Sequence, residues 1–385
     1  MPKLFRITTV PISIEKLLGN QLTYMNQFYE VTAISADEKE LTRVGKELGV
    51  KTHAIEMTRK ITPLQDLKSL WKMYNYFKNE KPEIVHTHTP KAGLIGMLAA
   101  KMAGIKTRLH TVAGLPLMET SGAKRKLLNS VEKLTYICAT KVYPNSHGLR
   151  NFIINENLCP DRKLKVLGNG STNGIDVNYF DPEIFSKEAK MIFRKQLGID
   201  ENDFVFIFIG RIVADKGINE LVSAFKDIAQ HYNQRDDSSK IKLLLVGSFE
   251  ENLDPLLPEV LKDIQSNNDI VSVGFQKDVR PYLGISNTLA FPSYREGFPN
   301  VVMQAGAMGL PAIVSDINGC NEIIIENKNG IIVPAKNHLM LKDAMIQIIK
   351  NKVLYQIMSD NARYMIVERY QQSLIWESLK KEYTF

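Results

Sequence analysis

The chain has 385 residues, of which 44% are hydrophobic and 24% are charged. This length exceeds the usual size of one hydrophobic core, so we expect two domains, and the composition argues against a disordered, collagen-like or coiled-coil protein. The net charge of +7 is unevenly placed: residues 1–185 carry 26 basic and 17 acidic residues, whereas residues 186–385 carry 23 and 25. The basic first half indicates either an anionic partner (lipid headgroups, phosphates or nucleic acid) or a solvated face with no further role.

The cysteines and the first residues bear on the cellular compartment. Cys138, Cys159 and Cys320 form no CxxC pair, which argues against a disulfide framework or a zinc knuckle and suits a reducing cytosol. Residues 1–3 lead directly into a strand-like run at 4–10 without a signal-peptide pattern. No apolar run reaches the roughly 18 residues that a transmembrane helix needs. We therefore expect a cytoplasmic protein.

Short apolar runs alternate with helical stretches along the chain, a pattern typical of buried parallel strands in an α/β fold. In the first half, the pattern predicts strands at 4–10, 84–88, 108–112, 142–146 and 165–168 and a helix at 93–104. In the second half, it predicts strands at 204–209, 242–246 and 289–291, helices at 186–197 and 218–230, and helical structure after 336. We expect two Rossmann-like, doubly wound parallel-sheet domains that face each other across a cleft at the carboxyl ends of their strands.

The densest cluster of turn residues, at 168–174, marks the boundary between these domains. We predict a first domain at 1–170 and a second at 171–365.

Two basic residues follow the predicted strand at 204–209. Gly210-Arg211 directly follows the strand, and Lys216-Gly217 immediately precedes the next helix. Two cations beside a helix N-terminus with free backbone N–H groups make a site for a diphosphate. The alternative is that Arg211 and Lys216 are surface charges on a loop. Neither a Walker loop nor a GxGxxG motif is present.

A second segment, residues 294–305, combines a carboxylate, a Gly-Phe-Pro turn and the start of a helix. Backbone N–H groups at 298–300 are placed to meet an anion, while Glu296 and Gln304 offer polar groups to sugar hydroxyls. Asn300 and Gln304 are four residues apart and share one helix face. The alternative is a helix cap followed by a core glutamine.

Together these two segments resemble glycosyltransferase family 4, in particular the bacterial subgroup that builds lipid-linked polysaccharides and glycans. Further matching stretches are residues 85–88, 110–117, 173–176 and 319–322, so the resemblance spans about 85–325. It implies the GT-B fold, a retaining transferase reaction and a nucleotide-diphosphate sugar as donor substrate, with UDP favoured by family habit. It also implies that residues 366–385 cross back to the first domain.

The resemblance assigns roles to individual residues of the second domain. Arg211 and Lys216 would hold the donor diphosphate and stabilise the leaving group, and Glu296 would contact donor-sugar hydroxyls. Gln304 stands where the family usually has a glutamate that binds the nucleotide ribose. The remaining donor-binding residues implied are Gly210, Gly297, Phe298, Pro299 and Asn300. We expect no cofactor and no metal requirement, since no DxD pair sits at a loop.

In the first domain, His110 lies at a strand end and resembles the family histidine near the donor sugar; the alternative is a structural histidine. His86 and His88 lie in one strand, and we expect their side chains to face opposite ways, so that at most one lines the cleft. We also expect Arg59, His88 and Lys91 to contact the acceptor.

The stretch 122–137 places basic residues ahead of an apolar stripe. Such a helix can lie on an anionic membrane or can pack on its sheet with the basic residues outside. We expect a peripheral enzyme on the cytoplasmic face of the plasma membrane that extends a polyprenyl-diphosphate-linked saccharide, although a soluble saccharide acceptor stays possible.

Two rival functions are considered. A GT-B-fold UDP-sugar epimerase would need neither acceptor nor membrane. A nucleic-acid-binding protein is prompted only by the basic charge, since the sequence shows neither a recognition motif nor aromatic residues interleaved with the basic runs, so we expect no nucleic-acid partner.

Overall fold

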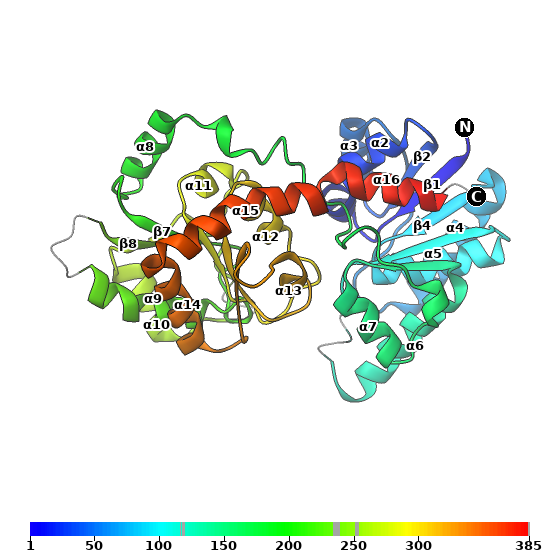
Figure 1. The fold of residues 1–385 in the computed structure, drawn as a ribbon. Helices are drawn as coiled ribbons and strands as arrows, with labels where there is room; N and C mark the ends of the chain where they lie inside the picture. Colours follow the sequence, from blue (N-terminus) through cyan, green and yellow to red (C-terminus); the bar gives the residue numbers. More distant parts are fainter. Residues whose placement is uncertain (116, 118–119, 234–238, 251–253, 384–385) are drawn as a thin grey trace. The chain divides into compact units, whose positions relative to one another are not determined.

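A computed structural model describes residues 1–383 except 116, 118–119, 234–238 and 251–253. Position 116, which belongs to the matching stretch 110–117, therefore lies outside the described residues. The chain forms two compact units: unit 1 comprises Met1–Gly174 and Gln372–Phe385, and unit 2 comprises Ile175–Gln371. Each contains one six-stranded sheet covered by helices (Figure 1).

The sheet of unit 1 is entirely parallel and has the order β3-β2-β1-β4-β5-β6. Its strands are β1 (Lys3–Ile7), β2 (Glu30–Ser35), β3 (Lys51–Ala54), β4 (Ile84–Thr87), β5 (Thr107–Val112) and β6 (Lys141–Pro144). Its helices are α1 (Pro11–Ser13), a π-helical turn (Ile14–Leu18), α2 (Asn20–Met25), α3 (Glu38–Leu48), α4 (Pro63–Glu80), α5 (Pro90–Met102), α6 (Gly122–Cys138), α7 (His147–Asn155) and α16 (Gln372–Tyr383).

Unit 2 repeats the arrangement with the parallel order β12-β11-β10-β7-β8-β9. Its strands are β7 (Phe204–Ile209), β8 (Ile241–Val246), β9 (Ile270–Ser272), β10 (Thr288–Phe291), β11 (Ala312–Ser315) and β12 (Gly330–Val333). Its helices are α8 (Lys187–Gln196), α9 (Ile218–Tyr232), α10 (Pro258–Ser266), α11 (Arg280–Gly284), α12 (Asn300–Ala307), α13 (Cys320–Ile323), α14 (His338–Lys350) and α15 (Lys352–Tyr370). The predicted α/β class with two doubly wound sheets is confirmed.

Helices cover both faces of the unit 1 sheet, so neighbouring residues of one strand are buried on opposite sides of it. Along β1, Leu4 and Phe5 point to opposite faces and join two separate hydrophobic clusters. The cluster that contains Leu4 also takes in Leu379 and Tyr383 of α16. The last helix of the chain therefore completes the core of the unit that holds the first strand.

The predicted strand at 165–168 is wrong. Leu164 makes a single bridge to Val142, and the next residues leave the edge of the sheet. Gly168 takes a left-handed conformation, with φ of 56°, which ends the extended backbone. The stretch 165–168 therefore predicts a strand that the sheet of unit 1 does not contain.

Candidate functional site

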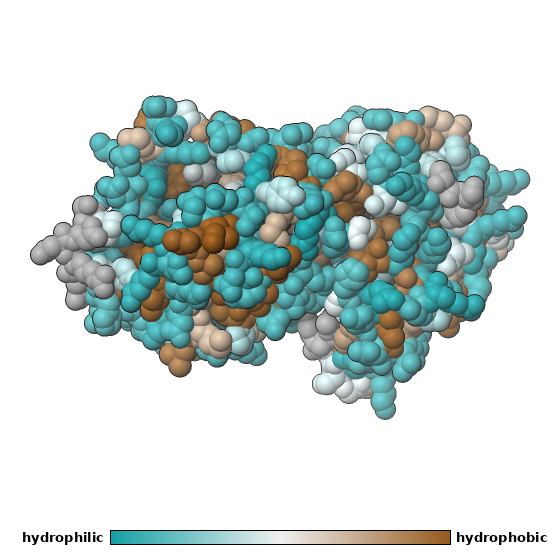
Figure 2. All heavy atoms as spheres, in the orientation of Figure 1, coloured by the Kyte–Doolittle hydropathy of each residue, from teal (hydrophilic) through white to brown (hydrophobic). Residues whose placement is uncertain are grey.

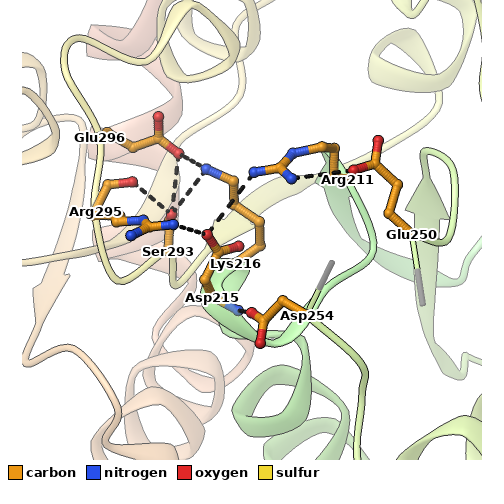
Figure 3. Close-up of polar contacts among 8 residues, drawn as sticks. All are labelled: Arg211, Asp215, Lys216, Glu250, Asp254, Ser293, Arg295 and Glu296. Carbon is orange, nitrogen blue, oxygen red and sulfur yellow. Dashed lines mark hydrogen bonds and ion pairs between the residues drawn. The ribbon is translucent and has the colours of Figure 1, made fainter. Parts of the chain in front are cut away.

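The central contact of unit 2 joins Lys216 to Glu296 (Figure 3). The Lys216 Nζ atom lies 2.6 Å from Glu296 Oε1, and the two side chains are only 15% and 19% exposed. Ser293, which follows β10, donates its hydroxyl either to the same carboxylate oxygen or to the Arg295 carbonyl, each at 3.1 Å. The contact therefore holds a cation and a carboxylate side by side at the ends of two strands.

Arg211 lies beside this contact and is more exposed. Its guanidinium is 3.2 Å from Glu250 and 3.9 Å from Asp215 (Figure 3). Asp215 in turn accepts a hydrogen bond of 2.8 Å from Arg295. Three basic side chains, from Arg211, Lys216 and Arg295, thus meet in this small region of unit 2, and each is paired with a carboxylate. A polyanionic ligand that binds these cations would compete with the carboxylates for them.

A close backbone approach at Gly217 fixes the position of Lys216. Gly217 has φ of 71°, and a Cβ atom there would lie 2.1 Å from the Pro292 carbonyl oxygen. Only glycine fits such a position, because a side chain would collide with the backbone that follows β10. The loop that carries Lys216 is therefore pressed against the segment that carries Ser293 and Glu296.

The predicted donor-binding segment lies next to this contact. Asn318 donates hydrogen bonds to the carbonyls of Glu296 and Gly297, at 3.3 and 2.5 Å. Phe298 is buried and packs on the ring of Tyr370, so its side chain belongs to the core. The other predicted residues flank these: Gly210 directly follows β7, Pro299 caps α12, Asn300 begins it and the half-buried Gln304 lies one turn on.

His110 belongs to unit 1, near the end of β5, and is almost completely buried. Its Nδ1 atom lies 2.7 Å from the Thr87 hydroxyl. Burial lowers the pKa of His110 to about 4, so the imidazole is neutral at neutral pH. A Cβ atom at Gly93 would lie 2.5 Å from its ring, which accounts for the glycine at this position of α5.

The prediction that His86 and His88 face opposite ways is wrong. Their ring centroids are 4.1 Å apart, because residues two apart along a strand share one face. Both are buried, and burial holds the pKa of each well below its usual value. His88 Nε2 accepts a hydrogen bond of 3.0 Å from the buried Arg6, while His86 contacts the hydroxyls of Thr111 and Tyr383. This network joins β1, β4, β5 and α16.

The two other predicted acceptor contacts lie around the start of α4 and α5. Arg59 is exposed in the loop before α4. The Lys91 ammonium is largely buried and forms an ion pair of 2.5 Å with Asp66. Its charge is therefore already matched within unit 1.

The structure adds three polar residues that the sequence analysis did not select: Ser293, Asp215 and Asn318. Each lies close to a residue of the two predicted motifs and supports its side chain or backbone. Ser293 follows an apolar strand by two residues, which is the one sequence signal that favours a role for it.

Among the described residues, no group of three or more histidine, cysteine, aspartate or glutamate side chains is arranged to hold a metal ion. None of the helices in the described ranges is both long and apolar enough to cross a membrane.

Two family models match the chain: the group 1 glycosyl transferases at residues 189–365 and the glycosyl transferase 4-like domain at residues 22–170. The chain is 34% identical over 382 residues to the capsular polysaccharide biosynthesis glycosyltransferase CapM of Staphylococcus aureus, covering 99% of this chain and 96% of CapM. It is 29% identical to the UDP-Gal:alpha-D-GlcNAc-diphosphoundecaprenol alpha-1,3-galactosyltransferase of Escherichia coli, covering 95% and 90% of the two chains.

The fold is that of solved glycosyltransferases. The structure of Anabaena HepE in complex with UDP and glucose matches with a TM-score of 0.80 at 17% identity, covering all of both chains. A glycosyltransferase from Rickettsia africae matches with a TM-score of 0.81 at 19% identity, over 99% and 97% of the chains. Two Rossmann-like units with this topology define the GT-B class. The chain belongs to glycosyltransferase family 4.

Proposed function

We propose that this protein is a retaining transferase that moves a sugar from a UDP-sugar to a polyprenyl-diphosphate-linked saccharide during surface polysaccharide biosynthesis. The observation that carries the proposal is the contact between Lys216 and Glu296, with Arg211 beside it. It places two cations suited to phosphate, Arg211 and Lys216, next to a carboxylate suited to accept hydrogen bonds from sugar hydroxyls.

The donor half of the proposal follows from the charges that develop during transfer. Breaking the bond between the anomeric carbon and the phosphate leaves negative charge on the diphosphate, and Arg211 and Lys216 stabilise that charge from fixed positions. Glu296 accepts hydrogen bonds from hydroxyls of the donor sugar, and Gln304 contacts the nucleotide ribose. Backbone groups of the segment 297–300 complete the donor contacts. UDP is favoured because HepE was solved with UDP and the E. coli relative is named for UDP-Gal.

Retention fits a displacement on one face of the sugar, in which the leaving phosphate takes the proton of the acceptor hydroxyl. This route needs no protein nucleophile. It also needs no metal, because the charge on the leaving group is met by side chains.

The acceptor half is supported by the names of relatives and by charge. The E. coli relative and a Campylobacter jejuni relative, 27% identical over 90% of this chain and 89% of its own, are both named for diphosphoundecaprenol acceptors. The basic first half of the chain suits a diphosphate acceptor at an anionic bilayer. We assign acceptor contacts to Arg59, His88 and Lys91, and contact with the transferred sugar to His110. The enzyme then works at the cytoplasmic face of the plasma membrane without spanning it.

No observation on this chain favours the rival functions. An epimerase needs no anionic acceptor, so it would not explain the positive charge of residues 1–185. The relatives named above are transferases. Charge alone does not make a nucleic-acid site.

The test is a transfer assay with radiolabelled UDP-sugars, in which a polyprenyl-diphosphate-linked saccharide and the same saccharide without lipid are compared as acceptors. We expect label in the lipid-linked product only, with an α-linkage when the donor is α-linked. Conversion of the donor to an epimer without acceptor would overturn the transferase proposal. Transfer from GDP-sugars alone would overturn the choice of UDP.

A further inference from the structure

The loop before α4 and the first half of that helix expose four large apolar side chains. Ile61, Leu64, Leu67 and Trp71 are 62%, 87%, 64% and 59% exposed. Residues three and four apart lie on one face of a helix, so Leu64, Leu67 and Trp71 form a continuous line. Soluble proteins rarely leave such a line uncovered, and a contiguous exposed apolar patch marks an interaction surface.

The charged residues around this line are almost all basic. Lys68 and Lys72 are exposed on the same part of α4, and Arg59 and Lys60 precede it. Residues 57–79 contain five basic residues and one acidic residue, Asp66, and this stretch is flanked by Glu56 and Glu80. Asp66 is paired with Lys91, so it does not offset the exposed charge.

The opposite face of α4 is anchored in unit 1, so the exposed face is held in place. Ser69, Met73 and Phe77 are buried, and the Ser69 hydroxyl donates a hydrogen bond to the carbonyl of Glu56, which lies outside the helix. Trp71 stacks against Tyr74 with ring centroids 5.4 Å apart. The exposed apolar residues therefore belong to a packed helix.

Exposed apolar residues occur elsewhere too, but in a different setting. Figure 2 shows apolar side chains over the beginning of α15 in unit 2, where Val353 and Ile357 are exposed. The charged residues of that helix are of both signs, for example Lys352 and Asp360. The combination of an apolar line with charge of one sign separates the α4 surface from it.

We propose that Ile61, Leu64, Leu67 and Trp71, with Lys68 and Lys72, form a docking surface for an anionic lipid bilayer. The apolar side chains enter the boundary between headgroups and acyl chains, and the lysines contact lipid phosphates. Leucine and tryptophan on one face with lysine beside them are typical of helices that lie in a membrane interface. The docking serves the proposed function, because a lipid-linked acceptor is presented at that surface.

The first experiment is sedimentation of the full chain with vesicles, either of neutral phosphatidylcholine or with anionic phosphatidylglycerol added, at low salt. We expect binding to the anionic vesicles, reduced by salt. Leu64→Ser with Leu67→Ser removes two inserted side chains and should lower the partition coefficient about tenfold or more. Lys68→Glu with Lys72→Glu should abolish the preference for anionic vesicles.

Two controls keep this test specific. Val353→Ser with Ile357→Ser removes comparable exposed apolar area from α15 and should leave binding unchanged. Leu134→Ser with Ile137→Ser tests α6, which also exposes apolar and basic residues and is the rival docking helix. Loss of binding in the α6 variant, with none in the α4 variants, would overturn the assignment to α4.

Trp71 gives a second, direct measurement. The chain has two tryptophans, and Trp376 is half-buried with its ring N–H donated to Asn173. Trp376→Phe therefore leaves Trp71 as the only tryptophan emitter. Its emission should shift to the blue on anionic vesicles and be quenched by brominated lipid. Bound protein with an unchanged Trp71 spectrum would contradict the proposal.

The alternative partner for this surface of α4 is a second copy of this chain. If Leu64→Ser with Leu67→Ser lowers the molar mass in light scattering without lipid, the surface joins two copies and the bilayer proposal fails.

Transfer of sugar to a short-chain, water-soluble acceptor diphosphate tests the proposed function independently of membrane docking. The α4 variants should keep that transfer, whereas its absence in the unchanged chain would refute the function and leave the vesicle results standing.

Discussion

The ammonium of Lys216 lies 2.6 Å from a carboxylate oxygen of Glu296, although 80 residues separate the two in the chain. The pair is only partly exposed, so each group holds the other in a defined place before any ligand arrives. In the proposed function, a donor diphosphate competes with Glu296 for the ammonium of Lys216, and we expect this competition to release Glu296 to accept hydrogen bonds from sugar hydroxyls. Binding and positioning of the donor would then be coupled in one contact.

Replacing Lys216 or Arg211 by alanine should lower kcat by about 100- to 1000-fold, because each removes a fixed charge from the leaving diphosphate. Steady-state kinetics with the UDP-sugar measures the effect. Lys226→Ala is the matched control, since Lys226 forms an exposed ion pair with Asp263 in the same unit. Full activity in both Lys216→Ala and Arg211→Ala would refute the diphosphate assignment.

Ser293→Ala should lower kcat about tenfold while the KM for the donor changes little. The buried hydroxyl contacts the Glu296 carboxylate, and one hydrogen bond to a charged group corresponds to roughly 1.5 kcal/mol. Kinetics and thermal unfolding are measured on the same preparation. A lower midpoint of unfolding with unchanged kcat would make Ser293 a purely structural residue.

Gln304→Glu should tighten UDP binding about fivefold. A carboxylate accepts charge-assisted hydrogen bonds from ribose hydroxyls, which a neutral amide does not, and the gain is about 1 kcal/mol. Calorimetric titration with UDP gives the dissociation constant. Gln230→Glu makes the same exchange at an exposed position of α9 in the same unit and serves as the control. Equal effects of the two substitutions would argue for general electrostatics and against contact of Gln304 with ribose.

Transfer should be unaffected by EDTA and not increased by added Mg²⁺ or Mn²⁺. In the proposed function, Arg211 and Lys216 stabilise the negative charge on the leaving diphosphate, so we expect no requirement for a divalent cation. The measurement is the initial rate in protein dialysed against chelator. A rate that falls on dialysis and returns with one metal would show that the side chains do not suffice.

Glu132→Gln should stabilise the protein above pH 7 and have little effect near pH 4.5. Glu132 is buried in α6 beside Tyr136, and burial raises its pKa to about 7. Between pH 4.5, the usual pKa of a glutamate, and pH 7, Glu132 loses its proton in the unfolded chain but keeps it in the folded protein. The free energy of unfolding therefore falls as the pH rises through that window. The amide removes the loss, which is at most about 3 kcal/mol. Urea unfolding at pH 5 and pH 8 measures the difference between the two proteins. A substitution that costs the same at both pH values would show that Glu132 does not titrate in this window.

The fold could be predicted where strands are buried on both faces. The run Phe204–Ile209 is apolar throughout, and the predicted strand matches β7 residue for residue. Five of the described strands, β2, β3, β9, β11 and β12, are not among the predicted ones. Residues such as Glu30 and Lys51 interrupt the apolar pattern of β2 and β3, whereas β11 is buried throughout and still lies outside the predicted strands. The incorrect strand at 165–168 shows the reverse case. These residues follow a single bridge to the edge strand β6, but they do not pair with it as a further strand.

The candidate site could be predicted as far as its two motifs. Arg211, Lys216 and Glu296 stand out because charged residues at the ends of apolar strands are unusual. Ser293 and Asp215 carry no periodic signal, and only the folded backbone brings them to Glu296 and Arg295. The error at His86 and His88 was one of strand geometry, because a spacing of two keeps both rings on one face.

The position of α16 has a consequence for synthesis. Glu382 accepts a hydrogen bond from Tyr143 at 3.0 Å and pairs with Lys141 and Lys165, and the Tyr383 hydroxyl lies 2.6 Å from His86. These partners leave the ribosome more than 200 residues before α16 does. Part of the core of unit 1 therefore stays uncovered until α16 has been translated. A chain that stops before α16 would keep all six strands of that unit and lack the helix that closes it.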